Sequence, residues 1–292
     1  MRVVHTAAQV REYATSGTRA VVMTMGALHE GHLALVRAAR AAADQVIVTV
    51  FVNPLQFNDA ADLERYPRDL EADAALLEPL GVDVVYAPSV EDVYPGGRPT
   101  VTVSAGAIND VFEGACRPGH FDGVLTVVLK LIHLTSPDMV FFGQKDAQQV
   151  IAIRAMVRDL NVATRVEVVD TVRDDDGLAL SSRNVFLSAT ERENALVLNQ
   201  ALAESTQVLA EGGKASLAVA VARAALAQVP SVEVEYVGAL DPASAQAVPD
   251  DYRGEVVIAV AARVGQTRLI DNVVGWAGER PSLEPSEEDA AS

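Results

Sequence analysis

The chain has 292 residues, of which 50% are hydrophobic and 22% are charged, so it can bury a core and is not a disordered chain. Its length suits one large domain or two modest ones. Acidic residues number 40 against 23 basic residues, a formal net charge of -17, which argues against a nucleic-acid binder or a polybasic membrane anchor, because both need a basic face.

The first 170 residues alternate between short β-branched runs and longer runs with helical periodicity. In chain order they predict a strand over 19–25, a turn over 26–31, a helix over 32–43, a strand over 46–52, a helix over 70–80, a strand over 82–86, a helix over 124–134, a strand over 138–142, a helix over 147–160 and a strand over 164–169. Strands that alternate with helices indicate an α/β fold with a doubly wound parallel sheet. Ligands bind at the carboxyl ends of strands in such sheets, so the turns after the strands are the places to search.

The second half of the chain has a different pattern. Ser188 to Glu191 form a capping box that begins a long helix, which we expect to end near Gly212 and Gly213. A helix over 216–228 and strands over 232–240, 255–263 and 267–272 follow, and we expect these strands to be antiparallel. We place the boundaries so that a domain over 1–171 precedes a smaller α+β domain over 172–275 and an acidic, disordered tail over 276–292, beginning at Trp276.

The compartment is indicated by what the sequence lacks. Cys116 is the single cysteine, which rules out a disulfide framework and a cysteine cluster for a metal. The N-terminus lacks the apolar run of a signal peptide, and no apolar run approaches the roughly 18 residues that span a bilayer. We therefore expect a cytoplasmic protein with no membrane and no nucleic acid as partner.

The strongest signal for function is TMGALHEGH over 24–32, which leaves a predicted strand and enters a helix. The N-terminus of a helix offers free N–H groups and the positive end of the helix dipole, and both suit phosphate. Gly26 and Gly31 let the backbone approach a ligand closely, and His29 and His32 add two side-chain donors. The segment predicts a phosphate-binding turn.

A zinc site is the competing interpretation of these histidines. The HExxH pattern of zinc enzymes has histidines four residues apart on an established helix, whereas His29 and His32 are three apart at a helix start. Nothing else in the sequence supplies a clear third ligand. Two surface histidines without a function are a further alternative.

Three more segments carry polar groups that could meet at the same sheet edge. Residues 143–146 follow a predicted strand and hold Lys145, one of three lysines in the chain. Residues 177–184 place two serines beside Arg183, which gives several donors for phosphate oxygens. Residues 51–57 place an amide beside apolar walls, which suits a small polar acid. Taken singly, each is also explained as an ordinary surface turn.

Familiar nucleotide and hydrolase motifs are missing from the sequence. It has no GxxxxGK[ST] phosphate loop, no GxGxxG fingerprint and no GxSxG elbow. A nucleotide would therefore be bound by the histidine-bearing turn.

Six segments, in this order and spacing, resemble the pantothenate synthetase (pantoate–β-alanine ligase) family. They are TMGALHEGH, FVNPLQF, DLERYPRD, GHFDGVLTVV, FFGQKDAQQ and DGLALSSRN. The resemblance is dense from Val21 to Asn184 and loose beyond. The short HxGH pattern within the first segment is shared with the wider nucleotidylyltransferase group.

The resemblance implies an enzyme that joins pantoate to β-alanine with ATP and Mg²⁺. In this family the pantoate carboxylate attacks the α-phosphate, which gives pantoyl adenylate and pyrophosphate. β-Alanine then attacks the acyl carbon, which gives pantothenate and AMP. The resemblance also implies a Rossmann-like domain with a smaller C-terminal lid domain, and a homodimer.

The resemblance assigns roles to individual residues. ATP would be bound by Met25, Gly26, Ala27, Leu28, His29, Glu30, Gly31, His32, Gly143, Gln144, Lys145, Asp146, Val172, Leu180, Ser181, Ser182 and Arg183. The catalytic groups would be His29, His32, Lys145, Ser181, Ser182 and Arg183, with His32 at the position of the proton donor. Pantoate and β-alanine would be bound by Met25, Asn53, Gln56 and Gln149, and Mg²⁺ by Asp73. Met23 and Ala147 depart from the family pattern, which usually has a proline and an aromatic residue there.

Two rival functions stay open at this point. One is a nucleotidyltransferase that acts on a phosphate ester, but Gln56 and Gln149 suit a small hydroxy acid better, since an ester phosphate calls for more basic residues. The other is a nucleotide-binding regulatory protein without turnover, against which the complete set of polar groups argues.

Overall fold

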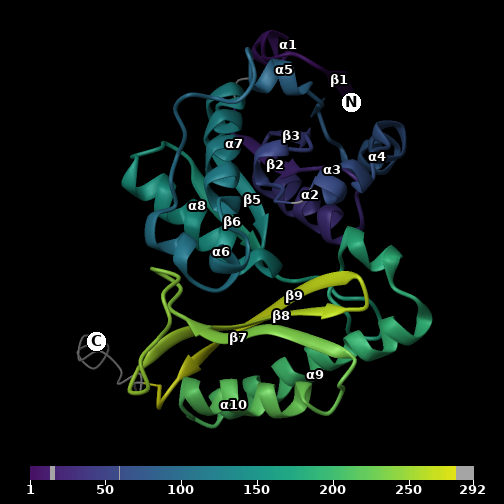
Figure 1. Ribbon diagram of the computed structural model, residues 1–292. Coiled ribbons are helices and arrows are strands. Elements are labelled where there is room, and N and C mark those ends of the chain that lie inside the picture. Colours follow the sequence, from purple (N-terminus) through teal and green to yellow (C-terminus); the bar gives the residue numbers. More distant parts are fainter. Residues whose placement is uncertain (14–16, 59, 281–292) are drawn as a thin grey trace, which may run out of the picture.

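The computed structural model describes residues 1–13, 17–58 and 60–280, which form two stacked domains (Figure 1). The first domain is built on a parallel sheet, and the second is built on an antiparallel sheet. No helix within these ranges is long and apolar enough to cross a membrane.

The sheet of the first domain has six strands. They are β1 (Arg2–Val4), β2 (Arg19–Thr24), β3 (Gln45–Val50), β4 (Val84–Tyr86), β5 (Met139–Gly143) and β6 (Arg165–Val169). Their spatial order is β1-β4-β3-β2-β5-β6, and the neighbours are parallel. Since side chains alternate between the faces, Val21 and Ile47 pack into one core, whereas Val22 and Val48 pack into another. Both faces are buried, which explains the unbroken apolar runs of these strands.

Helices cover both faces of this sheet. The face of Val21 packs against α1 (Ala7–Glu12), α5 (Val90–Val93), α7 (His120–Thr135) and α8 (Ala147–Asp159). The opposite face packs against α2 (Glu30–Ala42) and α4 (Leu70–Leu77). Two short helices, α3 (Ala60–Arg65) and α6 (Phe112–Cys116), lie in the connections. The predicted doubly wound α/β fold is confirmed.

The second domain is a layer of three strands on a layer of two helices. Its strands are β7 (Val232–Leu240), β8 (Gly254–Val264) and β9 (Thr267–Ala277), and its helices are α9 (Ala189–Ala210) and α10 (Ala215–Leu226). One face of the sheet packs on these helices through residues such as Leu198 and Ile258. The other face turns toward the first domain, where Val257 packs with Ala147 and Ile151 of α8 (Figure 1).

The strand order creates a switch point between β2 and β5. The chain moves from β2 to β3 and β4 on one side, and later returns to β5 and β6 on the other side. Connections that leave neighbouring strands in opposite directions open a crevice at the carboxyl edge of the sheet. The turn after β2 and the turn after β5 border this crevice, so the chain brings together residues more than a hundred positions apart.

One predicted boundary is wrong. Strand β9 continues to Ala277, so Trp276 does not begin a tail: it lies opposite Glu255, and Ala277 lies opposite Gly254. The pairing extends because β8 begins at Gly254 and its backbone groups find their partners in β9. Residues 281–292 of the predicted tail lie outside the described residues.

Candidate active site

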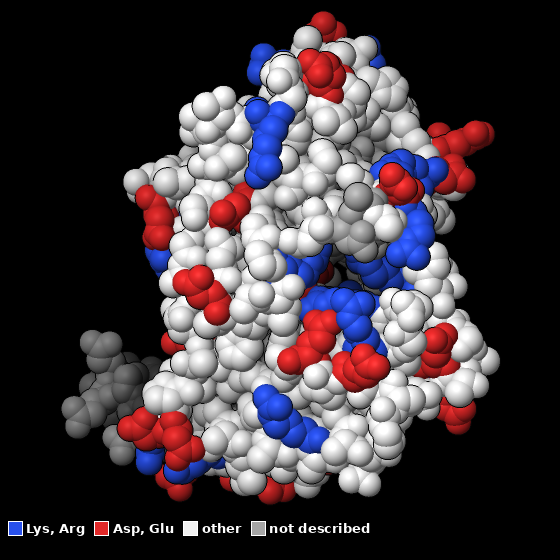
Figure 2. Space-filling view, in the orientation of Figure 1, with Lys and Arg blue, Asp and Glu red and all other residues white. Residues whose placement is uncertain are grey.

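A cavity lies in the crevice at the carboxyl edge of the parallel sheet. Lys and Arg side chains gather around this hollow, between the two domains, in spite of the acidic composition of the chain (Figure 2). The residues that line it include Met25, His29, Gly31, His32, Asn53, Gln56, Tyr66, Arg117, His120, Gly143, Lys145, Asp146, Gln149, Val172, Leu180, Ser181, Ser182 and Arg183. All the segments singled out in the sequence therefore meet at one place.

Two histidines cap the start of α2, directly after β2. His29 is the N-cap residue, and its Nδ1 accepts a hydrogen bond from the backbone N–H of Gly31 at 3.2 Å. Nδ1 of His32 accepts the backbone N–H of His29 at 3.3 Å. The two ring centroids are 4.1 Å apart. The arrangement is a capping box in which imidazoles replace the usual hydroxyl and carboxyl groups.

These hydrogen bonds decide which ring nitrogen carries the proton. Because Nδ1 is the acceptor in both rings, the neutral ring has its hydrogen on Nε2, which remains a donor. Burial, assisted by the charge of Lys145, lowers the pKa of His29 to about 4. Burial, with the charges of His29 and Lys145, lowers the pKa of His32 to about 3. At neutral pH both side chains are neutral donors, so they can bind an anion through hydrogen bonds but not through charge.

Asp73 of α4 binds the backbone of the turn between β2 and α2. Its Oδ2 accepts the backbone N–H of Ala27 at 3.1 Å, and its Oδ1 accepts that of Leu28 at 2.8 Å. Burial raises the pKa of this carboxyl, and the two backbone hydrogen bonds oppose the rise. Gly26 has a φ of +83°, and a Cβ there would lie 2.8 Å from Oδ2 of Asp73. The turn therefore needs both a glycine and a carboxylate.

Lys145 enters the cavity from the other strand of the switch point. It lies in the 3₁₀ turn Gln144–Asp146 that directly follows β5. Its positive charge acts on both His29 and His32, since it contributes to the lowered pKa of each ring. One cation and two neutral donors thus face the same volume.

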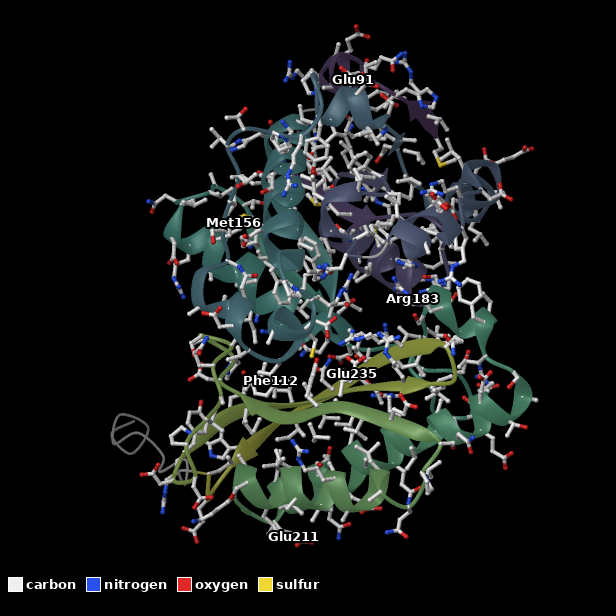
Figure 3. All side chains as sticks on the ribbon, viewed as in Figure 1. Glu91, Phe112, Met156, Arg183, Glu211 and Glu235 are labelled. Carbon is white, nitrogen blue, oxygen red and sulfur yellow. The ribbon has the colours of Figure 1, made fainter. Side chains whose placement is uncertain are left out.

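The serine and arginine segment borders the cavity beside the C-terminal domain. The backbone N–H of Leu180 donates to the carbonyl of Val172 at 3.0 Å, which closes a small loop ahead of the segment. Oγ of Ser181 then accepts the N–H of Arg183 at 3.2 Å and begins a 3₁₀ turn. Arg183 lies at the boundary between the two domains (Figure 3).

The predicted substrate amides separate into two kinds. Gln56, Gln149 and Asn53 all line the cavity, but the polar atoms of Asn53 are already paired. Asn53 is 1% exposed and is used internally: its Nδ2 donates to Oε1 of Gln56 and to the carbonyl of Gly123, each at 3.1 Å. Its Oδ1 accepts the hydroxyl of Tyr94 at 2.9 Å. Asn53 therefore positions Gln56 through the protein interior.

Several further lining residues, among them Tyr66, Arg117 and His120, are not among the site residues that the resemblance assigns. Arg117 and His120 both contact the backbone oxygen of Gln56, at 3.2 Å and 2.8 Å. Burial, with the charge of Arg117, lowers the pKa of His120 to about 4. The Arg183 guanidinium lies 6.0 Å from the ring centroid of Tyr66. His120 and Tyr66 stand inside segments that carry the family resemblance, but no pattern within those segments singles them out.

The family model described as pantoate-beta-alanine ligase matches residues 2–274. The chain belongs to the pantoate-beta-alanine ligase family. The sequence-based prediction of a ligase that condenses pantoate with β-alanine at the expense of ATP is confirmed, and the phosphate-ester nucleotidyltransferase is not supported.

Several pantothenate synthetases are similar to this ligase in sequence and structure over most of its length. It is 48% identical to pantothenate synthetase of Streptomyces avermitilis, over 92% of this chain and 96% of that protein. It is 54% identical to pantothenate synthetase 4 of Frankia alni, over 87% and 82%. The crystal structure of the Thermus thermophilus enzyme has a TM-score of 0.88 at 46% identity, covering 94% of this chain and 99% of that one. The Francisella tularensis ligase, crystallised with beta-gamma ATP and beta-alanine, has a TM-score of 0.77 at 34% identity, covering 94% and 97%.

Some residues that the resemblance assigns to ATP in this ligase do not line the cavity. They are Gly26, Ala27, Leu28, Glu30 and Gln144. Gly26, Ala27 and Leu28 contribute through their backbone: Gly26 adopts the positive φ of the turn, and the N–H groups of the other two donate to Asp73. Glu30 is exposed and pairs with Arg37 at 2.6 Å.

The donor set does not fit a metal held by protein side chains. Both carboxylate oxygens of Asp73 already accept backbone N–H groups, and the residue is 3% exposed. Within the described part of the chain, no group of three or more His, Cys, Asp or Glu side chains is placed to hold a metal ion, so His29 and His32 have no third protein ligand there. Asp174 and Asp176, in the acidic run, pair with Arg192 at 2.7 Å and 2.8 Å.

Proposed function

We propose that this ligase makes pantothenate in two steps within the cavity. The pantoate carboxylate attacks the α-phosphorus of ATP, the bond to the β-phosphate breaks, and pyrophosphate leaves. The amine of β-alanine then attacks the acyl carbon of pantoyl adenylate, and AMP leaves. Support comes from the family, and from the Francisella tularensis ligase with its ATP analogue and beta-alanine.

The observation that carries this proposal is the convergence of His29, His32 and Lys145 on one volume. A carboxylate is already ionised at neutral pH, so the first step needs no general base. It needs stabilisation of the negative charge that grows on the phosphates. Two Nε2–H donors and one ammonium supply this, and neutral imidazoles avoid the cost of holding three adjacent cations.

The remaining candidates complete the nucleotide and substrate contacts. We assign Ser181, Ser182 and Arg183 to the phosphates, because hydroxyls and a guanidinium at the domain boundary suit pyrophosphate oxygens. We assign Gln56 and Gln149 to pantoate, with Gln56 also next to β-alanine. Both amides line the cavity, and the backbone of Gln56 is held by Arg117.

We assign the role of a lid to the C-terminal domain of the ligase. An acyl adenylate is hydrolysed unless water is kept away, and closure of a domain over the site provides this protection. Figure 1 supports the assignment, since the face of β7, β8 and β9 turns toward the first domain.

We propose that Mg²⁺ enters together with ATP. Mg²⁺ commonly keeps several waters and binds through substrate phosphates with few protein carboxylates. The ion would supply charge neutralisation on the phosphates. We further propose, from the family resemblance, that the protein is a cytoplasmic homodimer. Light scattering on the purified protein, which measures the mass of the assembly, should give twice the mass of one chain.

The experiment that tests the two-step route is exchange of labelled pyrophosphate into ATP in the absence of β-alanine. We expect exchange that requires both pantoate and Mg²⁺, followed by AMP release when β-alanine is added. The His32→Ala variant should lose at least about 100-fold in exchange, the scale of one preorganised donor, with a smaller loss in ATP affinity. Folded protein that binds ATP but shows neither exchange nor pantothenate formation would establish the non-catalytic alternative.

A further inference from the structure

Two adjacent side chains of β9 reach from the C-terminal domain to the walls of the cavity. Asp271 and Asn272 are each 4% exposed and bind groups of the first domain or of the segment that joins the domains. Neither side chain lines the main cavity. Any effect they have on the reaction must therefore pass through the residues that they hold.

Asn272 binds the turn that carries Lys145. Its Nδ2 donates to the carbonyl of Gln144 at 2.9 Å and to that of Lys145 at 2.8 Å. Its Oδ1 accepts Nε2 of Gln144 at 3.1 Å. One amide thus binds two consecutive carbonyls, which fixes the rotation of that turn and the direction in which the Lys145 side chain leaves the backbone.

The turn has little support of its own. It precedes α8, whose N-cap residue Asp146 makes no side-chain capping hydrogen bond. The β5 strand ends at Gly143, directly before it. The hydrogen bonds that Asn272 donates to its two carbonyls come from the other domain and hold a turn that has no side-chain cap of its own.

Asp271 binds the base of the loop that precedes the serine and arginine segment. Its two oxygens accept Nη1 and Nη2 of Arg173 at 2.6 Å and 3.0 Å. Arg173 also donates to the carbonyl of Gly177 at 3.2 Å, and its neighbour Val172 lines the cavity. A bidentate pair of this kind sets the orientation of both groups.

We propose that Asp271 and Asn272 are positioning residues that hold the Lys145 turn and the loop before Ser181 in the register that the ATP phosphates require. Docking of the C-terminal domain then aligns the cation of the first domain at the same moment as it covers the site. The proposal rests on the proposed function, because it assumes that Lys145 contacts ATP.

The first test is the Asn272→Asp variant, which keeps the size of the side chain and loses both N–H donors. A carboxylate would then face two carbonyl oxygens, so the turn must shift. We expect kcat/KM for ATP in pyrophosphate exchange to fall by about 10- to 100-fold, the effect of a misplaced catalytic group, with KM for pantoate changed by less than about 3-fold. The matched control is Gln266→Glu, the same chemical change in the exposed turn between β8 and β9, which should keep wild-type kinetics.

A double-mutant cycle separates positioning from a general loss of structure. If Asn272 acts through Lys145, adding Asn272→Asp to Lys145→Ala should change the residual exchange by less than about 2-fold, since the side chain to be positioned is gone. A full further drop in the double variant would overturn the proposal, and so would wild-type kinetics in Asn272→Asp. If Asn272→Asp does not fold by circular dichroism, Asn272→Ser takes its place in the cycle. Absence of exchange in the wild-type protein would instead refute the proposed function.

Discussion

Arg268 of β9 donates to both carboxylate oxygens of Glu113 of α6, at 2.7 Å each, across the boundary between the two domains. Glu113 is 6% exposed. Burial alone would raise the pKa of this carboxyl, but the hydrogen bonds and charge of Arg268, with the charge of Arg117, hold it below its ordinary value. Arg117 in turn donates to the carbonyl of Gln56. The ion pair that docks the C-terminal domain is thereby connected to the proposed pantoate site.

We expect Glu113→Ala to lower the free energy of unfolding by about 2 kcal/mol, because Arg268 loses two charged hydrogen bonds and keeps only its ion pair with Glu235. Chemical denaturation measures this loss. The matched control is Lys214→Ala, which breaks the exposed pair between Lys214 and Asp250 and should cost less than about 1 kcal/mol. Equal losses in the two variants would show that the interdomain pair contributes no more than a surface pair.

We expect Asp73→Asn to raise KM for ATP by about 10-fold, because an amide cannot accept both N–H groups of the turn after β2. The Mg²⁺ concentration that gives half-maximal activity, measured at saturating ATP, should stay unchanged. The reason is that the Asp73 carboxylate accepts hydrogen bonds from the backbone N–H groups of Ala27 and Leu28 and is not expected to bind the metal. Measuring the activity of the wild type and the variant over a range of Mg²⁺ concentrations checks this expectation. A large increase in the Mg²⁺ requirement at unchanged ATP affinity would show that Asp73 binds the metal.

We expect the free energy of unfolding to fall as the pH is lowered from about 6.5 to about 4. The folded-state pKa values of His29 and His120 are lowered to about 4 and that of His32 to about 3, against an ordinary value of 6.5. In this window the unfolded chain binds more protons than the folded chain, so stability rises with pH and is lost on acidification. Each histidine contributes at most about 1.4 kcal/mol per pH unit. Denaturation at several pH values checks this, and His32→Asn should have a shallower dependence; an unchanged slope would contradict the lowered pKa of His32.

The packing between the domains depends on a close approach that has no signal in the sequence. A Cβ at Gly238 of β7 would lie 1.9 Å from the ring of Phe112, so the ring occupies the space that a side chain would need. Phe112 also contacts Tyr236, with ring centroids 5.7 Å apart. Figure 3 shows Phe112 and Glu235 along this boundary. A glycine within a strand could equally mark a bulge, and only the contact explains it.

The sequence by itself determined the local elements and the motif that they present. β-Branched runs, helical periodicity and the HxGH turn are properties of neighbouring residues. They were sufficient for the doubly wound sheet, the C-terminal strands, the position of His32 at the start of a helix and that of Lys145 directly after a strand. The three-residue edge strand β1 was missed because only Val4 of it is buried, so it lacks the apolar run that predicted the equally short β4.

Only the tertiary structure decided how those motifs are supported. Asp73 and Asn272 are polar residues whose partners are distant in the chain, so no spacing reveals that they hold the turn after β2 and the Lys145 turn. Asn53 lies only three residues from Gln56, but its other partners, Gly123 and Tyr94, are distant. A buried polar group must find a partner wherever the fold provides one. The resemblance assigns Asp73 to Mg²⁺, and only the structure shows that its two oxygens accept the N–H groups of Ala27 and Leu28.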